Sequence, residues 1–254
     1  MSLPTILVVN DDGIFAPGIR ALVSVAKEFG HVVVVAPDSP QSAKGHSISI
    51  NEILRLRKVD KFEGVEAYEC SGTPVDCVKM AKHLVLHDRP IDLVVSGINH
   101  GTNASISIIY SGTMSAAMEA SHEGLKAIGL SHVNHSFDID FEATKHFVRY
   151  FISKALADDY PKGRLLNVNI PDLPLENIKG IKVCRQAKGR WKENFIEGKD
   201  PSGKKYYWLS GHFELLDDGE DTDIYALEHG YVSVVPSTHD LTDYDAIELF
   251  RKIL

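Results

Sequence analysis

Short apolar runs alternate with segments of helical periodicity through the first half of the chain, and this alternation constrains the fold more than any other feature. The runs are rich in β-branched residues and continuously apolar, which is typical of strands buried on both faces of a parallel sheet. Helices that connect such strands form right-handed crossovers. The pattern predicts an α/β fold with a mostly parallel sheet flanked by helices in three layers. The expected strands are Ile6–Val9, Val32–Ala36, Leu93–Ser96 and Ala127–Leu130, and the expected helices are about Pro17–Phe29, Pro74–Leu86, Thr113–Glu123 and Phe141–Ala157.

The second half of the chain does not continue this alternation of strands and helices. Within the first half, HSISINEILRLRKV alternates in polarity, which predicts an additional, partly exposed strand pair. LLNVNIP, GIKVCRQ and GYVSVVP read as strands, and LTDYDAIELFRKIL reads as an amphipathic C-terminal helix. Residues 187–224 are aromatic and polar with several glycine-containing turns, which predicts hairpins. Since no linker separates these parts, we expect one domain over 1–254, with a core at about 1–186 and a hairpin-rich appendage at about 187–254.

Composition excludes several classes of partner. A formal net charge of −8 argues against a broad face for duplex nucleic acid, which would need clustered Lys and Arg. A small anionic substrate is compatible with this net charge if a local cation supplies positive charge. Cys70, Cys77 and Cys184 show no ligand-like spacing and indicate reduced, buried thiols in a reducing compartment. The apolar runs are too short to cross a bilayer. These features predict a cytoplasmic protein without a membrane partner.

The first expected strand ends in Asn10-Asp11-Asp12-Gly13. At about 5 Å and an effective dielectric constant of about 20, two carboxylates repel each other by roughly 3 kcal/mol. Pro17 and the helical periodicity after it place this pair on a strand-to-helix turn, where open α/β sheets bind ligands. A hard divalent cation takes oxygen ligands and would offset the repulsion. A solvated turn is an equally supported alternative at this point.

Two further strand ends carry small polar residues. In APDSPQSAKGHS, Ser42 could supply a neutral oxygen to a metal, although a turn cap is the simpler interpretation of this segment alone. In LVVSGINHGTNASISIIYSGTMSAAMEA, the start of the helix and the hydroxyls of Ser111 and Thr113 predict an anion site. A plain connecting loop would explain the glycines but not the density of Asn, Ser and Thr. ECSGTPVDCVKMAKHL is either another anion-facing helix start or an ordinary cap.

Several common catalytic signatures are missing from the sequence. It contains no HExxH pattern, no GxGxxG, no Walker A loop and no GxSxG. These omissions count against a histidine-bound zinc, a dinucleotide enzyme, a P-loop NTPase and an α/β-hydrolase.

Taken together, the quoted motifs resemble the SurE (survival protein E) family of 5′/3′-nucleotidases in order and spacing. The matching segments are NDDGIFAPGI, APDSPQSAKG, SGTPVDCV, SGINHGTN, YSGTMSAAMEA and DTDIYALEHGYVSVVPSTHDLT, from residue 5 to about 242. The resemblance implies a Rossmann-like core and a metal-dependent phosphomonoesterase that converts nucleoside 5′- and 3′-monophosphates to nucleoside and phosphate. Short polyphosphate is a second candidate substrate.

The resemblance also implies the roles of individual residues. It implies one divalent cation per subunit, Mg or Mn, held by Asp11, Asp12, Ser42 and Asn99. It implies a catalytic set of Asp11, Asp12, Asn99 and Ser111, and a substrate- and phosphate-contacting set of Asn10, Gly101, Asn103, Ser111, Gly112 and Thr113. We expect attack by a metal-activated water that Asp11 or Asp12 orients or deprotonates. The alternatives are Asp11 as a covalent nucleophile and, as a different class, a non-catalytic module that binds Mg and nucleotide.

Members of the resembled family form homodimers or homotetramers by exchanging C-terminal elements. Residues 187–254, with Trp191, Tyr206, Tyr207 and Trp208, are the candidates for that exchange here. One position departs from the family pattern: many relatives have a His four residues after the Asp that corresponds to Asp240, whereas this chain has Tyr244. With an ordinary pKa near 10, a tyrosine is a poor general acid at neutral pH. Any such function would be absent or taken by a neighbour such as His239.

Overall fold

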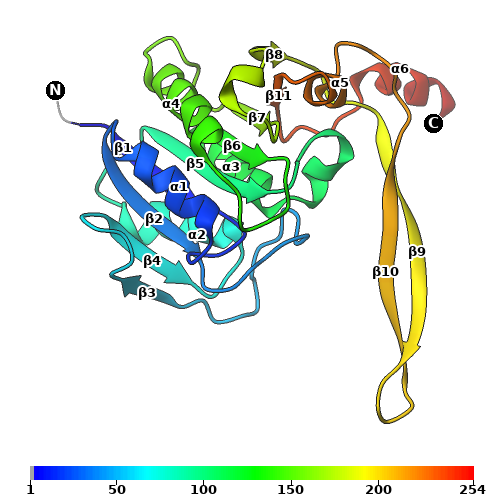
Figure 1. The fold of residues 1–254 in the computed structure, drawn as a ribbon, viewed down its shortest axis with the longest axis horizontal. Helices are drawn as coiled ribbons and strands as arrows, with labels where there is room; N and C mark the ends of the chain where they lie inside the picture. Colours follow the sequence, from blue (N-terminus) through cyan, green and yellow to red (C-terminus); the bar gives the residue numbers. More distant parts are fainter. Residues whose placement is uncertain (1–2) are drawn as a thin grey trace.

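A nine-stranded sheet forms the centre of the computed structural model, which describes residues 3–254 (Figure 1). Its strands are β1 (Thr5–Val9), β2 (His31–Pro37), β3 (Leu56–Val59), β4 (Glu66–Cys70), β5 (Leu93–His100), β6 (Ala127–His132), β7 (Leu165–Ile170), β8 (Ile181–Val183) and β11 (Val232–Ser237). They lie in the order β3-β4-β2-β1-β5-β6-β7-β11-β8. Only β3 with β4 and β7 with β11 pair antiparallel. The prediction of a mostly parallel sheet is confirmed.

Helices cover both faces of this sheet. The helices α1 (Pro17–Ala26) and α4 (Glu142–Leu156) pack on one face, and α2 (Pro74–Met80) and α3 (Gly112–His122) pack on the other (Figure 1). Alternate residues of β1 show why the strand had to be apolar throughout, because Ile6 and Val8 join the core under α1 and α4 while Leu7 and Val9 join the core under α2 and α3. The three-layer arrangement is therefore confirmed.

Local sequence explains where the helices begin. Pro17 and Pro74 occupy first-turn positions, where the missing N–H costs no hydrogen bond. Thr73 and Asp76 form a reciprocal capping box at the start of α2. The expected helix over 74–86 is α-helical only to Met80 and continues as a π-helical turn, Ala81–Val85.

The expected strand pair over HSISINEILRLRKV is wrong for most of its length. Only Leu56–Val59 forms a strand, and its partner is β4, which the sequence pattern did not predict. Residues 46–55 form a loop because side chains of α2 satisfy its polar groups: Ser49 Oγ and N–H both donate to Asp76, at 2.8 and 3.1 Å. The Thr73 hydroxyl donates to the Ser47 carbonyl at 2.7 Å.

Residues beyond 186 form one long hairpin and then return to the sheet. The strands β9 (Gly189–Lys199) and β10 (Lys205–Leu215) pair antiparallel and project from the body (Figure 1). The helix α5 (Asp223–Glu228) follows, and β11 then enters the main sheet between β7 and β8. The sheet thus takes a strand from beyond residue 186, where we expected the core to end. The helix α6 (Tyr244–Ile253) ends the chain with no buried residue.

Residues 3–254 also contain two short 3₁₀ segments, η2 (Ser105–Tyr110) and η3 (Leu175–Asn177). Over residues 3–254, no helix combines the length and the apolar character that crossing a membrane requires.

The topology decides where a site can form. The strands β2, β1 and β5 are neighbours and run parallel, so their carboxyl ends meet at one edge of the sheet. Asp11 and Asp12 follow β1, Ser42 lies in the segment after β2, and Asn99 lies at the end of β5. Polar residues predicted separately from three strand ends therefore belong to one edge of the sheet, where doubly wound folds bind ligands.

Candidate functional site

The two acids after β1 are held in different ways. Asp11 is only 3% exposed, and the Thr113 hydroxyl donates a hydrogen bond to its Oδ1. The Asp12 Oδ2 accepts hydrogen bonds from the Nδ1 of His100 at 2.9 Å and from the His100 backbone N–H at 3.3 Å. Each carboxylate thus has a fixed orientation supplied by a residue more than eighty positions away in the chain.

Burial makes the charge on Asp11 unfavourable. Desolvation is the largest effect and the neighbouring Asp12 the second, and together they raise the pKa of Asp11 from its ordinary 3.8 to about 6, against the lowering effect of the Thr113 hydrogen bonds. A carboxylate in this condition is stabilised by a cation. The fold has placed the Asp11 carboxyl group where water alone does not compensate its charge.

The helix α3 begins directly beside Asp11. The hydroxyl of Ser111 accepts the Met114 N–H at 3.0 Å and caps the helix, which leaves the hydroxyl hydrogen of Ser111 available to a ligand. At Gly112, a Cβ would lie 2.6 Å from the Asp11 Cβ. The close approach of the helix to the acid therefore requires glycine at this position.

Gly112→Ala is expected to destabilise the protein by about 1–3 kcal/mol, because the added methyl group must displace either Asp11 or the first turn of α3. Urea unfolding followed by circular dichroism measures this. The sign is informative, since alanine is otherwise better than glycine inside a helix by roughly 0.5–1 kcal/mol. A variant as stable as the original protein, or more stable, would show that Gly112 and Asp11 are not in close contact.

The end of β5 supplies an amide to the same place. Asn99 Nδ2 donates to the Gly101 carbonyl at 2.7 Å, and its Oδ1 lies 3.4 Å from the Thr113 hydroxyl that binds Asp11. The amide oxygen of Asn99 is thereby turned toward the acid. Gly101 has φ +104°, and a Cβ there would lie 2.3 Å from the His135 ring, so this turn also requires glycine.

A cavity of about 560 Å³ opens over these groups. One wall carries Asp11, Ser42, Asn99, Asn103 and Ser111 from the sequence-predicted set, together with Tyr110. The opposite wall comes from the hairpin of β9 and β10, through Trp191, Glu193 and the segment 209–211. The volume suits a small organic ligand. We call the part lined by Asp11, Ser42, Asn99 and Ser111 its polar end, and the rings of Tyr110 and Trp191 add aromatic surface to the lining.

Other residues expected in the site lie behind its surface. Asn10 is fully buried, and its Nδ2 donates to the Gly13 carbonyl at 2.9 Å, which holds the turn after β1, while its Oδ1 has no protein partner. Asn103 itself lines the cavity, and its Nδ2 donates to the Ser131 hydroxyl at 2.8 Å. The remaining expected residues, Asp12, Gly101, Gly112 and Thr113, support the residues of the cavity wall.

The oxygen donors present fit a hard cation. Two carboxylates, an amide oxygen and a hydroxyl are ligands that Mg²⁺, Mn²⁺ and Ca²⁺ accept. Among residues 3–254, no three His, Cys, Asp or Glu side chains gather as a metal-binding group. That result excludes a cluster built from such side chains alone within this range, but leaves a mixed set of oxygen ligands such as Asp11, Asp12, Ser42 and Asn99.

Sequence reasoning did not identify His100, Trp191 or Glu193 as parts of the site. His100 belongs to the SGINHGTN motif, and its position between the predicted site residues Asn99 and Gly101 is the sequence feature that points to it. Its side chain is 2% exposed and is covered by the rings of Phe137 and Phe141, with centroids 4.4 and 5.7 Å away. Tyr244 and His239 lie outside the cavity wall: the Tyr244 hydroxyl donates to Asp240, and the His239 ring packs on His122.

Comparison with known proteins gives the family. A family model described as "Survival protein SurE" matches residues 6–193, well over half of the chain. The chain belongs to the SurE family. Its similarity to SurE proteins extends over nearly the full length: it is 58% identical to "5′-nucleotidase SurE" of Cytophaga hutchinsonii, over 97% of this chain and 95% of that protein. It is 54% identical to the protein of the same name from Flavobacterium psychrophilum, over 98% and 96% of the two chains.

A solved SurE structure has the same fold. The crystal structure of the SurE protein from Aquifex aeolicus superposes with a TM-score of 0.83 at 42% identity and covers 98% of this chain and 99% of that one. The resemblance inferred from the motifs is therefore confirmed at the level of family and fold.

Proposed function

We propose that this SurE chain is a divalent-metal-dependent phosphomonoesterase that hydrolyses nucleoside 5′- and 3′-monophosphates to nucleoside and phosphate. Relatives that match nearly the whole chain carry the name 5′-nucleotidase. The observation that carries the proposal is the buried Asp11 carboxylate beside the start of α3, at the polar end of the cavity. An anionic phosphate can occupy that end only if a cation separates it from the acids.

Asp11, Asp12, Ser42 and Asn99 are the residues that would hold one cation, Mg or Mn. A bound divalent cation supplies polarisation of a phosphoryl oxygen and lowers the pKa of a water molecule beside the phosphorus. Asn99 is already oriented by its bond to the Gly101 carbonyl, and Asp12 by its bonds to His100. These bonds fix the ligand oxygens before the cation arrives, as outer partners do in metal sites.

The protein's own groups then handle the substrate. The hydroxyl hydrogen of Ser111 and the backbone at the start of α3 donate to the equatorial phosphoryl oxygens, where negative charge is stabilised in phosphoryl transfer. Asp11 or Asp12 orients the attacking water and accepts its proton. Burial and the Thr113 hydrogen bond leave Asp11 poorly placed as a covalent nucleophile, and this supports water as the attacking group.

The aromatic side chains of the cavity would receive the nucleoside. Trp191 and Tyr110 offer ring surface next to polar groups, a combination suited to a base and a sugar. Short polyphosphate would use only the polar end, which makes it a candidate second substrate.

We also propose assembly into a homodimer or homotetramer through exchange of C-terminal elements. The side chains of Tyr206, Tyr207 and Trp208 on β10 are exposed, and none of the residues of α6 is buried, so both elements offer apolar surface to a second copy. A cytoplasmic location is supported by Cys70, Cys77 and Cys184, which are all free thiols.

Phosphate release from purified protein tests the function. We expect release from 5′- and 3′-nucleoside monophosphates in the presence of Mg²⁺ or Mn²⁺, with Co²⁺, Ca²⁺ and short polyphosphate as further arms of the same screen. Binding of nucleotide without release of phosphate would contradict hydrolysis and support the non-catalytic alternative. A rapid-quench search for a phosphorylated Asp11 separates the two mechanisms, since attack by water leaves no phosphoenzyme.

A further inference from the structure

The two walls of the cavity come from segments that are far apart in the sequence. One wall includes Ser107 and Tyr110 of the 3₁₀ segment η2, and Ser111, which follows it directly. The other belongs to the hairpin, through Trp191 and Glu193. The contacts that join the start of η2 to the base of the hairpin therefore set the spacing between the two walls.

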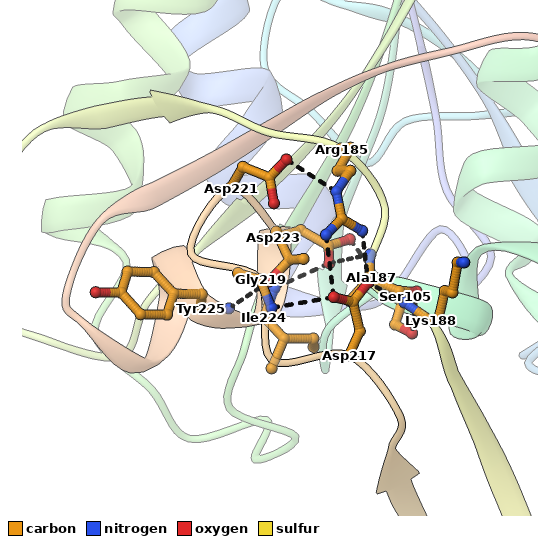
Figure 2. Close-up of polar contacts among 11 residues, drawn as sticks. Ser105, Arg185, Ala187, Lys188, Asp217, Gly219, Asp221, Asp223, Ile224 and Tyr225 are labelled. Atoms are coloured by element: carbon orange, nitrogen blue, oxygen red, sulfur yellow. Dashed lines mark hydrogen bonds and ion pairs between the residues drawn. The ribbon is translucent and has the colours of Figure 1, made fainter.

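The carboxylate of Asp223 connects the two segments (Figure 2). Asp223 Oδ2 accepts the Ser105 backbone N–H at 2.8 Å, and its Oδ1 accepts the N–H groups of Ala187 and Ile224, both at 2.9 Å. Ser105 is the first residue of η2, and Ala187 lies two residues before β9. Asp223 is 118 residues from Ser105 and 36 from Ala187 along the chain.

The connected groups are buried and constrained. Asp223 is 1% exposed, and Ser105 is fully buried with φ +52°, a conformation that side-chain-bearing residues adopt rarely. The Ser105 hydroxyl also donates to the Ala187 carbonyl at 2.9 Å. The start of η2 and the base of the hairpin are thus joined twice, once directly and once through Asp223.

An outer layer of charge fixes the segment that carries Asp223. The Arg185 guanidinium pairs with Asp217 and Asp221 (Figure 2). Asp217 also accepts the N–H groups of Lys188 and Gly219, at 3.1 and 3.0 Å. None of these bonds reaches Ser105, so Asp223 alone among these acids contacts the η2 side.

We infer that Asp223 is a positioning residue that sets the spacing between the η2 wall and the hairpin wall, and thereby controls how tightly the nucleoside part of a substrate is held. The inference rests on the proposed function. Two carboxylate oxygens are needed because each segment presents an N–H donor, and a hydrogen-bond donor at either position would meet another donor. The phosphate would bind at Ser111, Asp11 and Asp12, which all belong to the side of the cavity away from the hairpin. Phosphate binding therefore does not depend on the spacing between the two walls.

Two variants test this, with a matched control. Asp223→Asn keeps the side-chain shape but places an amide NH₂ against either Ser105 or Ala187. Ser105→Ala removes only the direct hydroxyl bond to the Ala187 carbonyl. Asp221→Asn is the control, because it makes the same chemical change in the same segment at a side chain whose contact is with Arg185.

The measurement compares the kinetic constants for a large substrate, which has a nucleoside part, with those for a small one, which has none. We expect KM for adenosine 5′-monophosphate to rise about tenfold in Asp223→Asn and about threefold in Ser105→Ala with kcat nearly unchanged, as for the loss of uniform binding. With glycerol 2-phosphate, which engages the phosphate end, kcat/KM is expected to stay within about twofold of the original protein. Hydrogen exchange at the Ser105 amide is expected to accelerate in Asp223→Asn and not in Asp221→Asn.

Equal losses on both substrates, or unchanged KM values with an active original protein, would overturn the inference alone. If Asp223→Asn does not fold, Ser105→Ala decides the question, and an unchanged KM in that variant overturns the inference. Failure of the original protein to release phosphate from either ester would overturn the proposed function, and the inference with it.

Discussion

Asp12→Ala is expected to lower kcat/KM for nucleoside monophosphates by at least about 10³-fold, because a divalent cation contributes several kcal/mol of transition-state stabilisation and each 1.4 kcal/mol is a factor of ten. The substitution removes one of the two anionic groups in the oxygen set. The protein is expected to stay folded, since within residues 3–254 the side chain of Asp12 has hydrogen bonds to His100 alone. Phosphate release measures the activity, and calorimetric titration with Mn²⁺ measures the accompanying loss of metal affinity.

Asp38→Ala is the matched control for this variant. Asp38 follows β2 at the same edge of the sheet but is exposed and lies outside the cavity wall, so activity is expected to stay within about twofold of the original. Treatment of the original protein with EDTA should abolish activity, and Mg²⁺ or Mn²⁺ should restore it. Turnover of Asp12→Ala within about tenfold of the original, or activity that survives chelation, would refute the ligand assignment.

The sequence predicted those parts of the fold that depend on local pattern. Continuous β-branched runs gave β1, β2, β5 and β6, because a strand buried on both faces has little other choice of residue. The strand β4 was missed because its sequence, Glu66–Cys70, contains two glutamates. One of them, Glu69, is buried at 6% exposure and pairs with Arg57 of β3, so the strand is stabilised by a neighbour that local pattern does not reveal.

The site was predicted only as far as its motifs reach along the chain. Asp11, Ser42, Asn99 and Ser111, which line the cavity, could be proposed from the sequence because each follows or ends a recognisable strand or begins a helix. His100 acquires its relation to Asp12 through burial beneath Phe137 and Phe141, more than thirty residues later in the chain. Trp191 was assigned from its exposure to contacts between subunits, whereas it also lines the cavity of its own chain. Such relations are set by tertiary packing.

Asp11→Asn is expected to have opposite effects on activity and on stability. Activity should fall by at least about 10³-fold, for the same reason as in Asp12→Ala. Without metal at pH 8, however, the variant should be more stable than the original protein by about 1–3 kcal/mol. The raised pKa of Asp11, about 6 against an ordinary 3.8, means that ionisation of this buried group costs the folded state about 3 kcal/mol, at 1.36 kcal/mol per pKa unit. An asparagine oxygen can still accept the Thr113 hydroxyl, so this cost is removed with little loss of bonding.

The pH dependence gives the sign of this effect independently. Between pH 3.8 and about 6 the folded protein retains a proton on Asp11 that the unfolded chain has released, so the free energy of unfolding of the original protein falls as pH rises through that window. The variant has no such group, and its advantage should therefore be small below pH 4, grow up to about pH 6 and then stay constant. Urea unfolding in EDTA at pH 4, 5, 6 and 8 measures this difference in the free energy of unfolding, with Asp38→Asn as control.

At pH 8, Mg²⁺ should stabilise the original protein and leave the stability of Asp11→Asn unchanged, because a ligand that binds the folded state alone raises the stability of that state. A variant less stable than the original at pH 8 would show that burial does not make the ionisation of Asp11 unfavourable. A variant that Mg²⁺ stabilises as much as the original would show that Asp11 is not needed for binding the cation.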